Sequence, residues 1–411
     1  MSQESYIRVK SQAVRVNAGQ FIMRIASERG GPRYAVSLAV TPSQVRLAEA
    51  DRAALARVHG DCCPGAAVYA GGPCKALGDA LKAASAPLAP EAAAGSLCHV
   101  DASLCDAAGH LLELVLRNPT PGTPGLRCPG LSGGFAAFPL LERLTMDGSE
   151  LGGDAEAAAR ALAPAPALEW VALRGAGLGG RLTCGLLLRG VRVLDVSDNK
   201  LEGPVPGCFF DNAHLMHLYA ANNRLGGALP AIGAQTALYF VSLAGQAPPG
   251  VDGAAGFTAL PPNLAAAANM SFLDVAQSRI AGQVGSLNDN LRFLNVSHNQ
   301  LTGPLPKLPA ALTHFDASLN NFTGGLPSDL SSAASLMVLN VSQNPALGPT
   351  RLPSTLPPAL RALSAARIGL EGPLEATALP DSLARIDLAD NRLEGKLPGL
   401  AGAVDVILLE A

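Results

Sequence analysis

The sequence is poor in aromatic residues and has no strong excess of either charge. Only 4% of its 411 residues are aromatic and the chain contains a single Trp, so any hydrophobic core must consist of Leu, Ala and Val. The formal net charge is -3, with both signs interspersed. This argues against a nucleic-acid partner, because nucleic-acid-binding proteins carry a basic face. No apolar run reaches the ~18 residues of a transmembrane helix, so we expect no membrane span in this chain.

Motifs that carry catalysis are also missing. The chain has no nucleophile elbow, no phosphate-binding loop, no H-E-x-x-H and no paired carboxylates in a plausible cleft. Glycine-rich runs such as Gly175–Gly180 follow an internal repeat and do not connect a strand to a phosphate-binding helix. We therefore expect a protein that is not an enzyme and that holds no cofactor and no metal.

The first 44 residues do not resemble a standard secretory signal. Residues 1–33 are polar and mildly basic, and the only apolar core, residues 34–40, is short and lies far from the start. A signal peptide needs an apolar run of about 7–15 residues close to the N-terminus. A weak signal behind an over-extended start, a poorly ordered tail and short strands all fit this segment. We favour the tail.

An internal repeat dominates the rest of the chain. The pattern L-x-x-L-x-L-x-x-N-x-L-x-G recurs with most spacings between 21 and 24 residues, and residues 244–268 contain an irregular insertion. We expect one further strand before the array, near 111–116, and one after it, near 404–409. The first apolar positions are Leu141, Leu168, Val191, Leu215, Leu238, Met270, Leu291, Leu312, Leu336, Leu360 and Leu383.

Two further columns accompany the apolar positions. A Gly lies twelve residues after each first position in all eleven repeats, which indicates a turn that needs a permissive backbone. An Asn lies eight residues after it in six repeats, at Asn199, Asn223, Asn299, Asn320, Asn344 and Asn391. Such an Asn is expected to turn inward and bond the backbone of neighbouring coils. Where Asn is replaced, as at Gln246 and Ser278, we expect looser packing.

These columns predict a solenoid, because one repeat is too small to bury its own Leu side chains and must stack on its neighbours. The fold class is an α/β-type leucine-rich-repeat right-handed superhelix, with a parallel β-sheet on the concave face and irregular or 3-10 turns on the convex face. We divide the chain into an N-terminal tail (1–44), a cap region with a helix and cysteines (45–110) and a solenoid of about 12–13 repeats (111–411). The C-terminal cap is expected to be absent, which leaves an end that another chain could cover.

The repeat resembles the plant-specific class of leucine-rich repeats. After the Gly, eight repeats place an apolar residue two positions on, and five continue with Pro, as in Val205-Pro206 and Leu305-Pro306. This L-x-G-x-[LVI]-P extension is similar to that of receptor-like ectodomains and polygalacturonase-inhibiting proteins, and the likeness covers roughly residues 98–411. It implies a non-enzymatic recognition module.

A second resemblance lies upstream. Cys98 and Cys105 are spaced C-x6-C before a Gly and the first strand, which resembles the family's N-terminal cap and implies a Cys98–Cys105 disulfide. The segment that begins at Asp51 is similar to the cap helix. The family's usual Trp and Gly between the two cysteines are missing here, which puts the packing of this cap in doubt.

Cysteines and glycosylation sequons bear on the compartment. Stacking of adjacent repeats should bring Cys184 and Cys208 close enough for a disulfide, whereas the pairing of Cys62, Cys63, Cys74 and Cys128 stays open. Buried free thiols in an intracellular protein are the alternative. Four N-x-[ST] sequons lie at Asn269, Asn295, Asn321 and Asn340. Together these features favour an extracellular or cell-surface location over the cytoplasm, the cytoskeleton or a cilium axoneme.

Side chains between the Leu positions of each strand should point to the concave face. The residues two positions after the first apolar position include most of the candidate binding residues, and Tyr219 lies two positions further on. These aromatic residues either contact a partner or pack on one another as a structural ladder, which is common at this place in plant-type repeats. The candidates are Trp170, His217, Tyr219, Phe240, Phe272, Phe293 and His314.

Three functions remain open from the sequence. The first is an extracellular recognition module that binds a protein, peptide or glycan on its concave face. The second is an intracellular scaffold on cytoskeletal or ciliary assemblies. The third, by analogy alone, is a secreted inhibitor of a wall-degrading enzyme.

Overall fold

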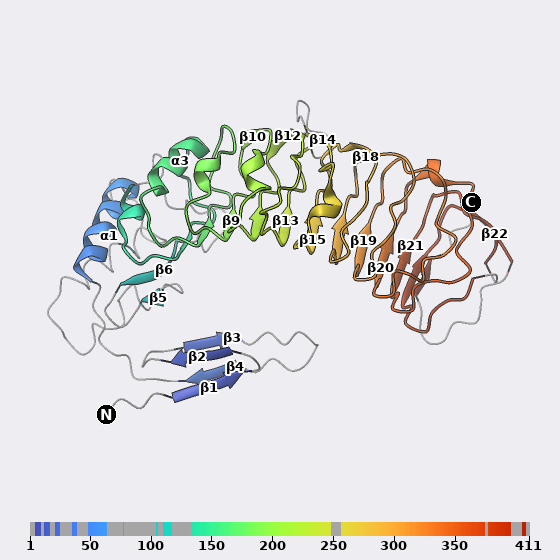
Figure 1. The fold of residues 1–411 in the computed structure, drawn as a ribbon, viewed down its shortest axis with the longest axis horizontal. Coiled ribbons are helices and arrows are strands. Elements are labelled where there is room, and N and C mark those ends of the chain that lie inside the picture. Colours follow the sequence, from blue (N-terminus) through green and yellow to red (C-terminus); the bar gives the residue numbers. More distant parts are fainter. Residues whose placement is uncertain are drawn as a thin grey trace.

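The computed structural model describes a continuous array of repeats with part of its N-terminal cap. The described residues are 5–9, 12–16, 21–24, 35–38, 48–63, 77, 104–105, 110–116, 128, 133–247, 256–374, 377–395 and 405–407. The array forms a curved solenoid, with helix α1 at one end and the last strands at the other (Figure 1). Short strands line the inner side of the curve.

The concave face is one sheet of fourteen strands in the order β25-β23-β21-β20-β19-β17-β15-β13-β11-β9-β8-β7-β6-β5. Only the β5–β6 pair is antiparallel, and the other neighbours pair in parallel. Each strand of the repeat array begins two residues after a predicted first apolar position. The parallel solenoid predicted from the repeat is therefore confirmed. The strands are β5 (Leu104–Cys105), β6 (Leu111–Val115), β7 (Arg143–Thr145), β8 (Trp170–Ala172), β9 (Val193–Asp195), β11 (His217–Tyr219), β13 (Phe240–Ser242), β15 (Phe272–Asp274), β17 (Phe293–Asn295), β19 (His314–Asp316), β20 (Val338–Asn340), β21 (Ala362–Ser364), β23 (Arg385–Asp387) and β25 (Asp405–Ile407).

A second, discontinuous set of parallel ladders forms around the Gly column. It comprises β10-β12-β14, β16-β18 and β22-β24. Nine of the eleven column glycines have φ between 71° and 89°, which only Gly adopts readily. Gly348 is the exception, with φ -88°, and Gly250 lies outside the described residues. These strands are β10 (Glu202–Gly203), β12 (Arg224–Ala228), β14 (Gly256–Ala259), β16 (Ala281–Gly282), β18 (Gln300–Leu301), β22 (Glu371–Pro373) and β24 (Arg392–Glu394).

The insertion predicted within 244–268 is partly regular. Its strand β14 extends the second ladder by pairing with β12, and a 3-10 turn, η7 (Leu264–Ala266), follows. Other short helices cover the side of the coil away from the concave sheet. Helix α3 (Ala155–Leu162) is an α-helix that the sequence did not predict, and the others are 3-10 turns as predicted: η4 (Gly133–Ala137), η5 (Cys184–Leu186), η6 (Gly207–Phe209) and η8 (Pro345–Leu347). Cys184 and Cys208, in η5 and η6, form the predicted disulfide, with their Cα atoms 6.1 Å apart.

The buried Asn column joins each coil to its predecessor. The amide of Asn320 donates to the carbonyls of Val296, Ala317 and Ser318, and its oxygen accepts from the N–H of Leu301 at 2.9 Å. The other five Asn residues repeat this arrangement. One side chain thus bonds to four backbone groups of the buried bend, which helps to meet their need for hydrogen-bond partners.

The expectation of looser packing where Asn is replaced is wrong at Gln246. Its longer amide donates to the carbonyls of Ala220, Leu243 and Ala244 and accepts from the N–H of Leu225, which reproduces the Asn arrangement. Ser278, at the same place one repeat later, donates its hydroxyl to two carbonyls and is fully buried. The coil adjusts to the side chain without opening.

Helix α1 (Glu49–Cys62) caps the N-terminal end of the core. Buried Asp51 accepts a hydrogen bond from the N–H of Leu111, and its second oxygen lies 2.6 Å from Nδ1 of His110. These contacts connect the helix to β6.

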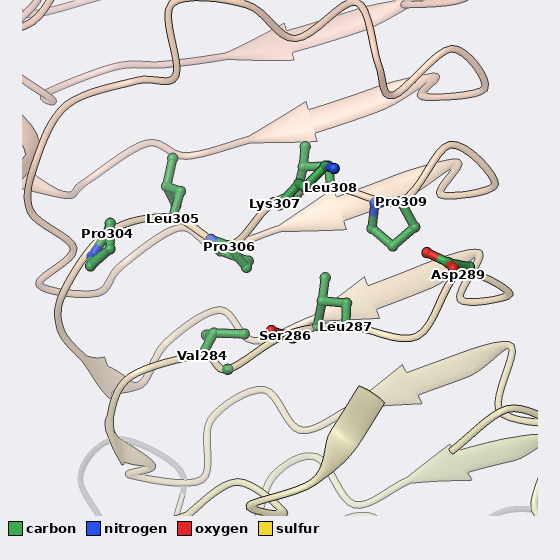
Figure 2. A pocket seen from close by; sticks show the side chains of 11 residues that line it. Val284, Ser286, Leu287, Asp289, Pro304, Leu305, Pro306, Lys307, Leu308 and Pro309 are labelled. Carbon is green, nitrogen blue, oxygen red and sulfur yellow. The ribbon is translucent and has the colours of Figure 1, made fainter. Parts of the chain in front are cut away.

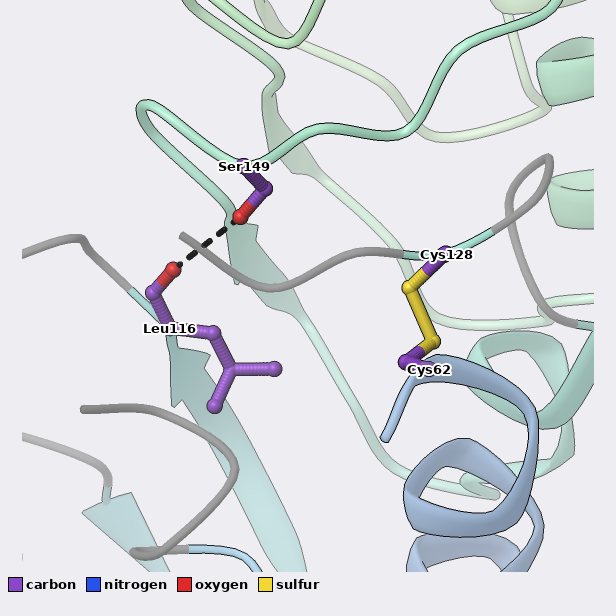
Figure 3. Close-up of a disulfide and its surroundings, with 4 residues drawn as sticks. All are labelled: Cys62, Leu116, Cys128 and Ser149. Carbon is purple, nitrogen blue, oxygen red and sulfur yellow. Dashed lines mark hydrogen bonds between the residues drawn. A yellow bond between two sulfur atoms is a disulfide. The ribbon is translucent and has the colours of Figure 1, made fainter. Parts of the chain in front are cut away.

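A disulfide joins Cys62, at the helix end, to Cys128 (Figure 3). The sequence left this pairing open. Cys63 is also disulfide-bonded. The Cys98–Cys105 pair implied by the resemblance lies outside the described residues, because Cys98 is not among them.

The described residues of the first 44 form four short strands. They form two antiparallel pairs, β1 (Ser5–Val9) with β2 (Gln12–Val16) and β3 (Phe21–Arg24) with β4 (Ala35–Leu38). Short strands were one of the three alternatives for this segment. The division of the chain into tail, cap and solenoid stays a prediction.

Each coil leaves its concave strand through a left-handed residue that the sequence pattern did not reveal. The residue seven positions after each first apolar position has φ between 52° and 72° in all eleven repeats. Three of these residues are Gly and the others have side chains, including Leu319, whose side chain is 41% exposed. A Cβ in this conformation costs roughly 1–2 kcal/mol, and Asn tolerates it best.

Replacing Leu319 with Asn should raise the free energy of unfolding by about 1 kcal/mol, because strain is relieved while little buried apolar surface is lost. Chemical denaturation measures the change, with one common value for the dependence of the unfolding free energy on denaturant concentration. Leu319→Ala is the matched control and should bring no such gain, since Ala keeps the strained Cβ. Equal midpoints for the two variants would show that this corner is not strained.

Candidate binding face on the concave sheet

Five aromatic side chains from adjacent strands form a continuous stack, the ring stack, made of His217, Phe240, Phe272, Phe293 and His314. The centroids of Phe240 and Phe272 are 3.9 Å apart and those of Phe272 and Phe293 are 4.1 Å apart, with the rings within 10° of parallel. The two His rings lie 5.8 Å from the neighbouring Phe at each end. All five are half-buried. The ring faces cover one another while part of each side chain remains open to the concave surface.

Tyr219 joins the ring stack and Trp170 does not. The Tyr219 ring lies 4.7 Å from that of Phe240, and its hydroxyl is 3.5 Å from Nδ1 of His217. Trp170 is separated from His217 by the Val193 strand and instead packs under the guanidinium of Arg143, 4.2 Å from the ring centroid. The structure therefore brings six of the seven predicted binding residues together and places the seventh apart.

A row of polar side chains runs beside the ring stack at the ends of the strands. Asp274, Asn295 and Asp316 each accept a hydrogen bond from the backbone N–H two residues further on. Asp195, Asn340 and Asp387 do the same. This local bond, typical of Asn and Asp in turns, gives the polar row a structural role at the end of each strand.

Burial shifts the pKa of three groups on this face. The pKa of Asp274 is raised, chiefly by burial and further by the negative charge of Asp316. Burial lowers the pKa of His217. It also raises the pKa of Tyr219, with a smaller contribution from Asp195. Each shift favours the neutral form of its own group, because burial disfavours the charged form.

A pocket of about 430 Å³ opens on the flank where the strands begin. Two of its lining residues are large hydrophobic side chains with high exposure: Tyr239 is 44% exposed and Met216 is 37% exposed. Tyr239 also contacts the ring stack, with its centroid 6.0 Å from that of His217. Met216 and Tyr239 lie one residue before the strands, outside the alternating strand positions that predict the concave face. The lining residues of this flank pocket are Arg192, Ala213, His214, Met216, Ala237, Tyr239 and Asn269.

Another pocket, of about 440 Å³, lies beyond the second ladder, between the segments that follow β16 and β18 (Figure 2). Val284, Leu287 and Leu305 contribute apolar surface, and Asp289 and Lys307 are charged groups in its lining. No set of convergent polar groups distinguishes it as a ligand site.

The four sequon asparagines differ in accessibility. Asn269 and Asn321 are exposed, whereas Asn295 and Asn340 are half-buried in the polar row. The Asn340 amide also donates to Asp316 at 3.1 Å. Glycosylation at all four stays a prediction, and the geometry favours the first two.

The described residues contain no group of three or more side chains suited to hold a metal ion. Among these residues, no helix is both long and apolar enough to cross a membrane.

Comparisons with known proteins identify the fold. A family model described as Leucine Rich Repeat matches residues 290–310. A sequence search of curated proteins found no match. Among solved structures, the chain is similar to the Arabidopsis receptor kinase HAESA in complex with the peptide hormone IDA and the co-receptor SERK1. The TM-score is 0.63 at 20% identity, over 84% of this chain and 54% of that chain.

Two further structures show the same likeness. The HAESA ectodomain with an N-terminally extended IDA peptide gives a TM-score of 0.59 at 20% identity, over 84% of this chain and 53% of that one. The PEPR1–AtPEP1 structure gives 0.58 at 18% identity, over 85% and 53%. The chain thus spans about half the length of these structures, and it shares their plant-type leucine-rich-repeat fold.

Replacing Asp274 with Asn should raise the stability of the protein at neutral pH. The amide can accept the same bond from the Ala276 N–H, as Asn295 does from Ser297, without a half-buried charge. Because the pKa of Asp274 is raised in the folded protein, the folded state binds more protons than the unfolded state at pH values between the ordinary Asp pKa and the raised pKa. The free energy of unfolding therefore falls as pH rises through this range. The gain in Asp274→Asn should therefore shrink as pH falls below the ordinary Asp pKa. Denaturation midpoints at neutral and acidic pH test this, and a gain that grew on acidification would contradict it.

Proposed function

We propose that this leucine-rich-repeat solenoid of plant type is a non-enzymatic recognition module that binds an extended polypeptide segment across the ring stack. The observation that supports this most directly is the uninterrupted row of half-buried rings from His217 to His314 on the concave face. A continuous aromatic patch bordered by polar groups is the usual chemistry of a protein-binding hot spot.

The dimensions of the ring stack fit a short peptide. Its five strands are adjacent in the sheet, so at about 4.8 Å per strand the rings span roughly 20 Å. An extended chain rises about 3.3 Å per residue, so about six residues would cover the stack. The polar row could bond to the backbone of such a segment along one side. The similar solved structures, HAESA with the peptide hormone IDA and PEPR1 with AtPEP1, support a peptide over other ligands.

An extracellular or cell-surface location is part of the proposal. The Cys62–Cys128 and Cys184–Cys208 disulfides support an oxidising compartment, since such bonds rarely persist in the cytosol. No observation on the described residues specifically favours the cytoskeletal scaffold or the inhibitor of a wall-degrading enzyme.

Replacing Phe240, Phe272 and Phe293 together with Ser should abolish peptide capture and leave a folded solenoid. The probe is a displayed library of random linear peptides, scored by enrichment on the wild-type and the variant protein. Lost ring contacts of about 0.5–1.5 kcal/mol each lower stability, but the Leu columns and the Asn column remain. The expected outcome is enrichment on the wild type alone, with a cooperative unfolding transition for both.

The matched control changes the same strand position outside the ring stack. Val338→Ser with Ala362→Ser alters two further side chains of the same row and should leave peptide enrichment unchanged. If the triple variant loses its unfolding transition, the rings are a structural ladder. If it keeps both fold and enrichment, the binding surface lies elsewhere.

Natively isolated protein should contain no alkylatable thiol before reduction. Intact-mass measurement after alkylation, with and without prior reduction, counts the cysteines that are free. All eight cysteines free in the native protein would rule out the extracellular location and favour an intracellular scaffold.

A further inference from the structure

We propose that Asn269 carries an N-linked glycan and that its first sugars occupy the flank pocket, packing on Tyr239 and Met216. The inference rests on the extracellular location proposed above, because the modification requires passage through the secretory pathway. The glycan would cover two exposed apolar side chains beside the ring stack.

The position of Asn269 suits the modification. The residue is exposed, begins the sequon Asn269-Met270-Ser271 and itself lines the flank pocket. Its amide nitrogen donates one hydrogen bond to the Thr236 carbonyl at 3.0 Å. That bond uses one of the two amide hydrogens and leaves the other position for the bond to the first sugar. The side chain is therefore held in place without being blocked.

The pocket offers surface that a sugar can cover. Tyr239 and Met216 are two of the four large hydrophobic side chains with high exposure among the described residues. Tyr239 belongs to the repeat before Asn269 and Met216 to the one before that, so at about 4.8 Å per strand the first sugar reaches the ring and the second reaches the thioether. The apolar C–H face of a sugar ring packs on both, while Arg192 and His214 in the lining can bond to its hydroxyl groups.

The other sequons lack this combination. Asn321 is exposed but is not a lining residue of the flank pocket. Asn340 is half-buried, and its amide nitrogen already donates to Asp316. Asn321 therefore serves as the matched control, because a glycan there would extend into solvent without these neighbours.

A glycan on Asn269 would limit the side from which a peptide reaches the ring stack. Tyr239 contacts His217 of the ring stack, so a glycan on Asn269 borders the peptide face on the flank where the strands begin. A bound peptide then has open access from the opposite flank, where the left-handed corner residues lie.

The test uses the full chain secreted from a eukaryotic host. Peptide mapping with enzymatic deglycosylation in heavy-oxygen water measures occupancy at each sequon, and we expect Asn269 to be occupied. The folded protein is then trimmed in two ways, either to one residual sugar per site or to none. We expect complete removal to lower the melting temperature by about 1–2 °C, a shift that corresponds to a contact of modest strength in a chain of this size. The single sugar keeps the contact with Tyr239 and loses the one with Met216, so it should lower the melting temperature by less.

Two variants assign the effect to the pocket. In Asn321→Gln the loss on complete deglycosylation should persist in full, whereas in Tyr239→Ala it should be smaller, because the contact between the first sugar and the ring is missing. An equal loss in Asn269→Gln and in the parent protein would overturn the pocket contact, because the effect would then come from another site.

Failure of this inference is distinguishable from failure of the proposed location. An unoccupied Asn269 on a secreted protein with all cysteines oxidised overturns the glycan and leaves the location intact. Unoccupied sequons together with free cysteines in natively isolated protein overturn both.

Discussion

Each coil must bend sharply away from its concave strand while the backbone of the bend stays buried. The hydrogen bonds of the Asn column stabilise this bend. One buried amide donates to three carbonyls, two in its own coil and one in the preceding coil, and accepts from the Leu301 N–H. Unsatisfied, such groups would cost about 1–3 kcal/mol each. Because the acceptor Val296 belongs to the preceding coil, the same bonds lock neighbouring repeats in register, and the concave sheet follows from this.

Register on the concave face creates the candidate site. In a parallel sheet with no slippage, residues at the same repeat position become neighbours, so Phe240, Phe272 and Phe293 stack although 32 and 21 residues separate them in sequence. The same rule aligns Asp274, Asn295 and Asp316 as a polar row. The strand ends thus supply hydrogen bonds that shape the turns, and the strand centres supply an apolar surface. A recognition module needs both, since the turns hold the surface rigid.

Features that recur in residue type were predictable from the sequence, and those that recur only in backbone shape were not. The Leu, Gly and Asn columns predicted the parallel sheet and its strand positions. The left-handed corner escaped detection because its residues share a backbone conformation and not a type of side chain. Gly148, Asp198 and Leu319, for example, all have φ between 54° and 71°. Gln246 looked like a loss of the Asn column, yet its extra methylene lets it make the same bonds.

The candidate site was predictable in part for the same reason. The ring stack lies on alternating strand positions, which strand periodicity reveals. Met216 and Tyr239 lie one residue before those positions, where side chains point to the flank pocket, and periodicity alone gives no warning of them. The Cys62–Cys128 pair joins residues 66 apart in sequence, and no repeat spacing relates the cap helix to Cys128.

Covalent footprinting of side chains, with and without a peptide that the protein selects, measures whether the ring stack is the binding surface. If a peptide binds across the rings, labelling of Phe240, Phe272 and Phe293 falls on binding, while labelling of the exposed Leu140, beside the N-terminal repeats, stays constant. Unchanged labelling of the three rings, with protection elsewhere on the solenoid, would contradict the claim that the ring stack is the binding surface.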